Sequence, residues 1–193
     1  MAKRNNRGSQ GSAGHGKLRI IGGRWRSRQL PIIDAEGLRP TTDRVRETLF
    51  NWLQQDIAGC RCLDLFAGTG ALGFEAASRG ASDVVMVEKA NAVFQQLKQN
   101  ASLLDADNVQ LLHRNAIEYL QQLTSAADFD IVFLDPPYQS GLLSAAIAAL
   151  TLPAGVIVYV EANVAEEITV PANWVQLKDK TAGQIHYCLY EIE

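Results

Sequence analysis

The stretch LDLFAGTGALG, residues 63–73, joins an apolar run to the start of a helical pattern through closely spaced glycines. Gly68, Gly70 and Gly73 fit the G-x-G-x-x-G spacing, in which glycines allow a tight strand-to-helix turn and a close approach of the backbone to a ligand. Asp64 stands inside the strand, four residues before the first glycine. The stretch therefore predicts a ligand site at the carboxyl end of a buried parallel strand.

Alternating strand and helix patterns surround this loop. Five short runs rich in Val, Ile, Leu and Phe are typical of strands buried on both faces: CLDLFA, VVMVE, VQLLH, FDIVFLD and GVIVYVE. Helical stretches lie between them, near residues 71–79, 91–103, 115–125 and 141–150. The end of the chain, WVQLKDK and QIHYCLYEI around a turn at Ala182-Gly183, is typical of an antiparallel hairpin. The pattern predicts an α/β protein with a Rossmann-like, mostly parallel seven-stranded sheet that ends in this hairpin.

The glycine loop has two candidate ligands. Glu88 ends the next strand, 20 residues after Gly68, where an acid binds the ribose hydroxyls of a dinucleotide in nicotinamide enzymes. A pyrophosphate, however, would meet the negative charge of Asp64, whereas a ligand with an ammonium group would be attracted to it. S-adenosylmethionine carries such a group together with an adenosine. An alternative role for Asp64 is to accept hydrogen bonds from amides of its own loop.

A second motif favours S-adenosylmethionine. The strand FDIVFLD ends in Asp135-Pro136-Pro137-Tyr138, whose prolines stiffen the backbone at the carboxyl end of a strand. Methyl transfer to an exocyclic amino nitrogen needs acceptors for the amino hydrogens, because the lone pair is otherwise delocalised into the base. Asp135 and the Pro136 carbonyl are placed to accept them, and Tyr138 to stack on a base that has been swung out of its helix. The alternative is an ordinary Pro-Pro turn that ends a strand.

The charge of the chain is divided unevenly. Residues 1–46 contain eleven Lys and Arg against three Asp and Glu, a net charge of +8, whereas the rest of the chain has a net charge of −11. This asymmetry favours an arm that binds a polyanion, with a solubilising tail as the alternative. Residues 1–16 are polar and glycine-rich, which predicts a disordered basic tail.

Two short runs flank Gly22-Gly23 and predict a basic β-hairpin within residues 17–38. Three arginines alternate along its second run with a tryptophan between them, and arginines for phosphates combined with an aromatic ring for a base are typical of RNA binding. The candidate RNA contacts of this run are Arg24, Trp25, Arg26 and Arg28. The third predicted part of the chain is the ligand-binding domain, residues 39–193. It opens with a helix after Pro40-Thr41-Thr42, whose apolar stripe of Val45, Leu49, Trp52 and Leu53 predicts packing against the core.

The stretches LDLFAGTGALGFEAASRGA and FLDPPY, together with Glu88, resemble the class I S-adenosylmethionine-dependent methyltransferases that act on amino nitrogens. GGRWRSRQL at 22–30 and RPTTDRVRETLFNWL at 39–53 closely resemble the RsmD family, bacterial enzymes that methylate N2 of guanine 966 in 16S rRNA. The resemblance covers the chain from about Lys17 to Glu161. It implies a class I methyltransferase fold, S-adenosylmethionine as cofactor and 16S rRNA as substrate, within the small ribosomal subunit or its assembly intermediate.

The resemblance also implies roles for single residues. The methionine end of the cofactor would contact Asp64, Phe66, Gly68 and Gly70, its ribose Glu88, and its adenine Asn115 and Ala116. The target amine would contact Asp135, Pro136 and Tyr138. Two residues of the family motif upstream, Arg39 and Thr41, would shape the guanine or the cofactor pocket.

Composition excludes several other classes of protein. The three cysteines form neither an even disulfide set nor a zinc spacing, and the three histidines show no metal spacing, so we expect a reducing, cytoplasmic environment and no metal. No apolar run approaches the ~20 residues of a membrane helix, and nothing in the sequence demands more than a monomer.

Four alternatives stay open at this point. A DNA adenine-N6 methyltransferase also uses Asp-Pro-Pro-Tyr, although it normally has an additional target-recognition domain. A protein glutamine methyltransferase usually has Asn-Pro-Pro-Tyr and needs no basic hairpin. A nicotinamide-dependent oxidoreductase would rest on the glycine spacing alone, and a non-catalytic RNA-binding module on the basic arm alone.

Overall fold

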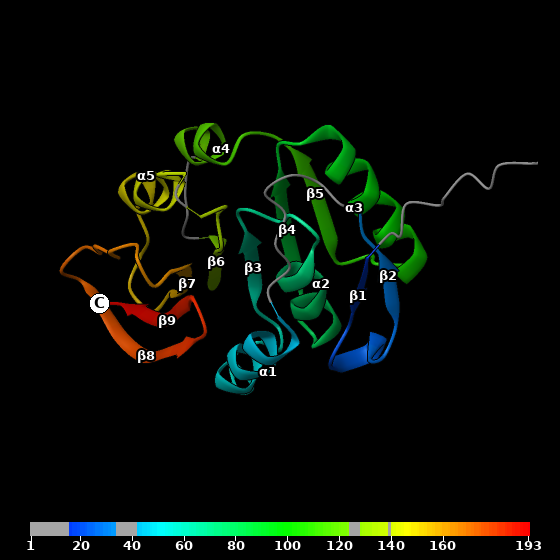
Figure 1. The fold of residues 1–193 in the computed structure, drawn as a ribbon, viewed down its shortest axis with the longest axis horizontal. Helices are drawn as coiled ribbons and strands as arrows, with labels where there is room; N and C mark the ends of the chain where they lie inside the picture. Colours follow the sequence, from blue (N-terminus) through cyan, green and yellow to red (C-terminus); the bar gives the residue numbers. More distant parts are fainter. Residues whose placement is uncertain (1–15, 34–41, 124–127, 139) are drawn as a thin grey trace, which may run out of the picture.

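A computed structural model of the protein describes residues 16–33, 42–123, 128–138 and 140–193. Its centre is a seven-stranded sheet in the order β5-β4-β3-β6-β7-β9-β8 with helices on both sides (Figure 1). The strands of this sheet are β3 (Arg61–Asp64), β4 (Asp83–Glu88), β5 (Val109–His113), β6 (Ile131–Leu134), β7 (Ile157–Asn163), β8 (Trp174–Ala182) and β9 (Ile185–Ile192). The α-helices are α1 (Asp43–Trp52), α2 (Ala71–Ser78), α3 (Asn91–Leu104), α4 (Ala116–Gln122) and α5 (Leu142–Ala149).

Strand direction brings the two main sequence motifs together. The five strands from β5 to β7 pair in parallel, and β9 pairs antiparallel with both β7 and β8. The predicted mostly parallel sheet with a C-terminal hairpin is therefore confirmed. Because β3 and β6 are neighbours, the glycine loop after β3 and the Asp-Pro-Pro-Tyr turn after β6 leave the same edge of the sheet side by side.

Two apolar layers hold the helices to the sheet. One layer buries side chains of α1, α2 and α3 against one face, and the other buries side chains of α4 and α5 against the opposite face. Val45 and Leu49 of α1, and Leu53 directly after it, are fully buried, as their spacing predicts. Trp52 is half-buried against Tyr187 of β9. No helix within the described ranges is long and apolar enough to cross a membrane.

The N-terminal segment forms the predicted hairpin, but with a different connection. Strands β1 (Lys17–Arg19) and β2 (Gln29–Pro31) pair antiparallel and lie against α2 and α3 (Figure 1). The prediction that the second strand runs from Arg24 is wrong, because Gly23–Trp25 is a short 3-10 helix, labelled η1, and the strand begins only at Gln29. The three arginines consequently do not alternate along one face of a strand.

The glycine pair serves close packing instead of a two-residue turn. Gly23 has φ +72, and a Cβ placed on it would lie 1.8 Å from the Ser78 carbonyl oxygen at the end of α2. Only glycine both adopts this backbone conformation readily and leaves room for the contact. The connection between β1 and β2 therefore lies directly on α2. The hairpin side chains Leu18, Ile20 and Leu30 are buried in the same apolar layer as the side chains of α1, α2 and α3.

Candidate active site

A cavity opens at the carboxyl ends of β3, β4 and β6. Nine of the predicted site residues line it together: Asp64, Phe66, Gly68, Glu88, Asn115, Ala116, Asp135, Pro136 and Tyr138. Gly70 does not line the cavity but stands directly before α2. The predicted residues Arg39 and Thr41, like the tail at residues 1–15, lie outside the described residues.

The glycine loop has the geometry that its spacing predicts. Gly68 and Gly70 both have positive φ, +51 and +81, and a Cβ on Gly70 would lie 2.5 Å from the Phe74 ring. A Cβ on Gly73 would lie 2.7 Å from the Met86 side chain, so the third glycine lets α2 pack closely on β4. The first two glycines shape the turn and the third sets the distance between helix and strand.

Asp64 is a buried carboxylate at the floor of this cavity. It is 2% exposed, and its Oδ2 accepts a hydrogen bond of 2.9 Å from the Gly73 amide. The alternative role, in which Asp64 binds an amide near its own loop, is therefore present in the structure. Burial, with the nearby charge of Glu88, raises the pKa of Asp64 from 3.8 to about 7, although the Gly73 amide opposes the shift. The carboxylate also has a backbone hydrogen bond with Phe66, and its remaining lone pairs leave it able to bind a cation.

Glu88 joins the two loops that border the cavity. Its Oε2 accepts from the Gly68 amide at 3.0 Å and its Oε1 from the Ala90 amide at 2.6 Å. The carboxylate is thereby held at the end of β4, where Glu88 lines the cavity, and each oxygen keeps a lone pair. Two adjacent hydroxyl groups, such as those of a ribose, match this pair of acceptors.

Asn115 has a structural function beside its predicted one. Its Oδ1 caps α4 by accepting from the amides of Ile117 and Glu118, at 2.9 and 3.3 Å. The side-chain NH₂ of Asn115 is not used by this cap and can donate to a ring nitrogen of a ligand.

The Asp-Pro-Pro-Tyr turn forms the wall opposite Glu88. Its last residue is fixed by a buried acid that the sequence analysis missed: the Tyr138 hydroxyl donates to Glu161 Oε1 at 2.9 Å. The other oxygen, Oε2, accepts from Tyr159 at 2.7 Å, and Glu161 is 1% exposed. Burial raises the pKa of Glu161, while the two phenol donors oppose the rise. The sequence gives one signal for this residue: the predicted strand that follows FDIVFLD, GVIVYVE, also ends in an acid, Glu161.

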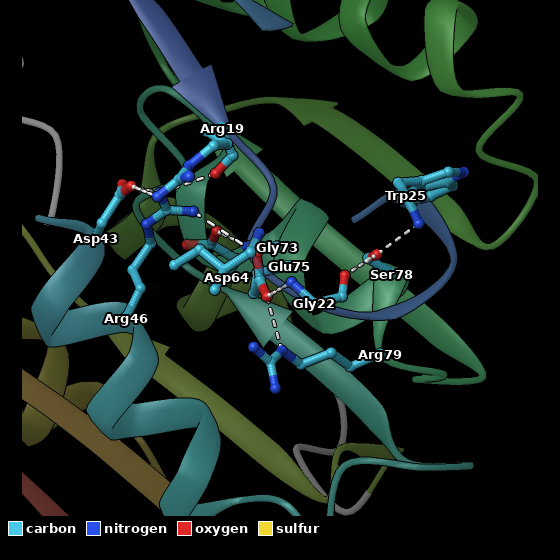
Figure 2. A network of polar contacts seen from close by, with 11 residues as sticks. Arg19, Gly22, Trp25, Asp43, Arg46, Asp64, Gly73, Glu75, Ser78 and Arg79 are labelled. Atoms are coloured by element: carbon cyan, nitrogen blue, oxygen red, sulfur yellow. Dashed lines mark hydrogen bonds and ion pairs between the residues drawn. The ribbon is translucent and has the colours of Figure 1, made fainter. Parts of the chain in front are cut away.

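A second missed group docks the hairpin to the body (Figure 2). Glu75 of α2 is fully buried, and its oxygens accept from the Ile21 and Gly22 amides, both at 2.8 Å, and from Arg79 Nε at 2.7 Å. On the other side of Glu75 lies Arg46 of α1, which is 1% exposed. Its Nη1 is 3.7 Å from Glu75 Oε2.

Arg46 links this acid to β1 and to the start of α1. Its Nη2 donates to the Arg19 carbonyl at 2.9 Å and to Asp43 Oδ1 at 2.6 Å, while Nε and Nη1 make no hydrogen bond with the described residues. Arg46 and Asp43 belong to the stretch RPTTDRVRETLFNWL, so part of that motif holds the hairpin in place.

The candidate RNA contacts of the hairpin differ in their surroundings. Trp25 is 5% exposed, and its amide donates to Ser78 Oγ at 3.0 Å. Its ring is buried in the core and covered by the Arg24 guanidinium at 4.2 Å, so the prediction that Trp25 offers a face to a base is wrong. Arg24 also binds Asp107 and Asn108, and Arg28 binds the Leu103 carbonyl. Arg26 is exposed.

The fold and the cavity define the class of protein. A parallel sheet followed by an antiparallel hairpin, with an acid-flanked glycine loop at the carboxyl ends of the strands, is the architecture of class I methyltransferases. An RNA methyltransferase from Salinibacter ruber, solved with S-adenosyl-L-homocysteine, has the same fold, with a TM-score of 0.61 at 16% identity over 80% of this chain and 94% of that chain.

The family follows from closer relatives. The model of a family described as Conserved hypothetical protein 95 matches residues 18–191, and the chain belongs to this family. The chain is 48% identical over 186 residues to the Ribosomal RNA small subunit methyltransferase D of Escherichia coli, which covers 94% of this chain and 93% of that protein. The corresponding protein of Haemophilus influenzae is 43% identical over 91% of this chain and 94% of its own length. A solved Escherichia coli structure has a TM-score of 0.82 at 46% identity over 92% of this chain and 99% of that chain. The resemblance to the RsmD family is confirmed.

Proposed function

We propose that the protein transfers a methyl group from S-adenosylmethionine to the exocyclic N2 of a guanine in 16S rRNA, on the small ribosomal subunit or its assembly intermediate. The observation that carries this proposal is the meeting of the glycine loop, Glu88 and the Asp-Pro-Pro-Tyr turn in one cavity. The names of the relatives support the ribosomal RNA of the small subunit as substrate. The particular guanine rests on the resemblance to the RsmD family.

The residues of the cavity fit both reactants. Asp64 offers a buried carboxylate to the ammonium group of the cofactor, and Glu88 offers two oxygens to its ribose. When bound there, S-adenosylmethionine supplies an electrophilic methyl group. On the opposite wall Asp135 and the Pro136 carbonyl accept the hydrogens of the guanine amino group, which directs the nitrogen lone pair toward the cofactor side of the cavity. Glu161 keeps the Tyr138 ring in one orientation, against which the base can stack.

The deciding experiment is a methylation assay with the purified full chain. Tritium-labelled S-adenosylmethionine is incubated with small ribosomal subunits that lack this methyl group, with naked 16S rRNA and with adenine-rich duplex DNA. Label recovered as N2-methylguanosine from ribosomal RNA supports the proposal, whereas label in the DNA supports an adenine-N6 enzyme. Binding of a nicotinamide cofactor in place of S-adenosylhomocysteine would instead indicate an oxidoreductase.

The raised pKa of Asp64 gives cofactor binding a pH dependence. Below about pH 7 the carboxyl group is largely neutral and attracts the ammonium group weakly, so affinity increases as the pH rises and the group ionises. We expect about a tenfold gain in affinity between pH 6 and pH 7.5, measured by calorimetry with S-adenosylhomocysteine. Asp64→Asn should bind more weakly and without this gain. An equal gain in Asp64→Asn would assign the pH dependence to another group.

Removal of the Glu88 carboxylate should weaken cofactor binding. Glu88→Ala loses two acceptors for the ribose and the bridge between the Gly68 and Ala90 amides, so we expect the dissociation constant to rise about 10- to 100-fold. Glu118→Ala, which removes an exposed acid from α4, is the matched control and should bind as the unaltered protein does. Unchanged affinity in Glu88→Ala would contradict the ribose role.

Deletion of residues 1–16 tests the basic arm. The segment carries Lys3, Arg4 and Arg7, each of which can release a counterion from a phosphate. We expect weaker RNA binding and a slope of log affinity against log salt that is shallower by about 2 to 3. The measurement is a filter-binding titration at several salt concentrations. A solubilising tail would leave the slope as it was.

A further inference from the structure

The terminal hairpin brings three metal-binding side chains together: Asp179 on β8, and His186 and Cys188 on β9. Asp179 pairs directly with Cys188 across the two strands, and His186 precedes Cys188 by two residues, so all three share one face of the sheet. The sequence predicts no metal, because the linear spacing of these residues resembles no known site. Strand pairing, and not spacing, creates the cluster.

One possible ligand atom of each side chain lies close to the other two. Asp179 Oδ2 and His186 Nε2 are 2.5 Å apart, and Cys188 Sγ lies 3.2 Å from the first and 3.3 Å from the second. Without a metal, the thiol and the imidazole nitrogen can each donate one proton to Asp179, and Tyr190 also forms a hydrogen bond with Cys188. A cation bound to all three atoms would replace the two protons and hold sulfur, nitrogen and oxygen together through one centre.

Two of the three distances are close to those around a tetrahedral ion. Metal–ligand bonds of about 2.0–2.3 Å place two ligand atoms roughly 3.3–3.8 Å apart, close to both distances that involve sulfur. The third pair, Asp179 Oδ2 and His186 Nε2, would have to move apart by about 1 Å when a metal binds. The Asp179 side chain is 49% exposed and the His186 side chain 30%, so both can rotate, and a water molecule can reach a fourth position.

The donor set selects the metal. A thiolate, an imidazole and a carboxylate together favour Zn²⁺ over the harder ions Mg²⁺ and Ca²⁺, which prefer oxygen ligands. A Zn²⁺ bound at this position would displace the thiol proton of Cys188.

We propose that Asp179, His186 and Cys188 bind one Zn²⁺ that ties the exposed edge strand β8 to β9. Among the strands that the structure describes, β8 pairs only with β9. It is exposed along almost its whole length and has an irregular register between Gln176 and Lys178. A cross-strand metal gives this edge a link that backbone hydrogen bonds with one neighbour do not supply. The site lies on the outer hairpin and does not depend on the proposed methyl transfer.

The test is a titration of the full, untagged chain, kept reduced and stripped of metal, with Co²⁺ as a spectroscopic probe and then with Zn²⁺. We expect one equivalent of Co²⁺ to give the visible bands of a four-coordinate ion and a near-ultraviolet thiolate band, which Zn²⁺ abolishes by displacement. Cys188→Ser and His186→Ala should each weaken binding at least about 100-fold. Cys60→Ser, which alters a half-buried cysteine before β3, should bind as the unaltered chain does.

Stability gives an independent measurement. A hundredfold excess of Zn²⁺ over its dissociation constant should raise the melting temperature by several degrees, and Asp179→Asn, an exposed change that leaves folding intact, should reduce this rise. Absence of a thiolate band, or binding of equal strength in Cys188→Ser and the unaltered chain, would overturn the proposal. The cluster would then be a hydrogen-bonded group and nothing more.

Discussion

Replacement of Asp135 by alanine should lower the turnover of methyl transfer about 10³-fold while leaving the affinity for the cofactor nearly unchanged. Asp135 lines the cavity on the wall opposite Glu88, at the end of a different strand, where its proposed partner is the amino group of the base. A contact that strengthens as the nitrogen becomes pyramidal acts on turnover more than on binding. Single-turnover kinetics and calorimetry with S-adenosylhomocysteine separate the two effects.

Two further variants sharpen this result. Asp135→Asn keeps one acceptor oxygen without the charge, so its turnover should fall between those of the alanine variant and the unaltered chain. Asp128→Ala removes an exposed acid whose contact is an ion pair of 3.7 Å with Arg61, and it should have nearly normal activity. If Asp135→Ala lost cofactor affinity in the same proportion as turnover, Asp135 would belong to the cofactor site instead.

The Glu75→Ala variant should lower the free energy of unfolding by about 3–5 kcal/mol, measured by urea denaturation. The change removes the acceptor for two hairpin amides and for Arg79. It also leaves the buried Arg46 guanidinium with only one of its two carboxylate partners, Asp43. Loss of one member of a buried ion pair is costly because the remaining charge stays out of water.

The neighbouring acid Glu47 provides the control. Glu47 is an exposed residue of α1, so Glu47→Ala should change stability by no more than about 0.5 kcal/mol. Hydrogen exchange adds a local measurement, because the Ile21 and Gly22 amides lose their acceptor only in Glu75→Ala. A loss of under about 1 kcal/mol, with both amides still protected, would mean that the apolar side chains alone hold the hairpin.

Much of the fold could be predicted because its signals are local. Each buried strand corresponds to a short run of apolar residues in the sequence, and each helix between these strands lies within a few residues of its predicted bounds. The glycine loop and the Asp-Pro-Pro-Tyr turn were likewise recognisable, since their chemistry depends on neighbouring residues. Nine predicted site residues consequently line one cavity.

The errors arose where distant segments meet. The alternation of Arg24, Arg26 and Arg28 predicts a strand. In the structure Gly23–Trp25 is a 3-10 helix, because Gly23 packs closely on α2 and Trp25 is buried. A Gly-Gly pair has the same appearance whether it forms a tight turn or permits a close approach.

The order of the strands and helices along the chain, the glycine loop and the Asp-Pro-Pro-Tyr turn can be predicted from the sequence, because each depends on residues close together in the chain. The packing of the folded chain, by contrast, brings Tyr138 to Glu161 and Cys188 to Asp179, and it places Glu75 and Arg46 against the hairpin. Each of these contacts joins groups from different segments of the chain. Their energies depend on burial and on distances of a few ångströms, which are set by how the elements pack and which no linear pattern records.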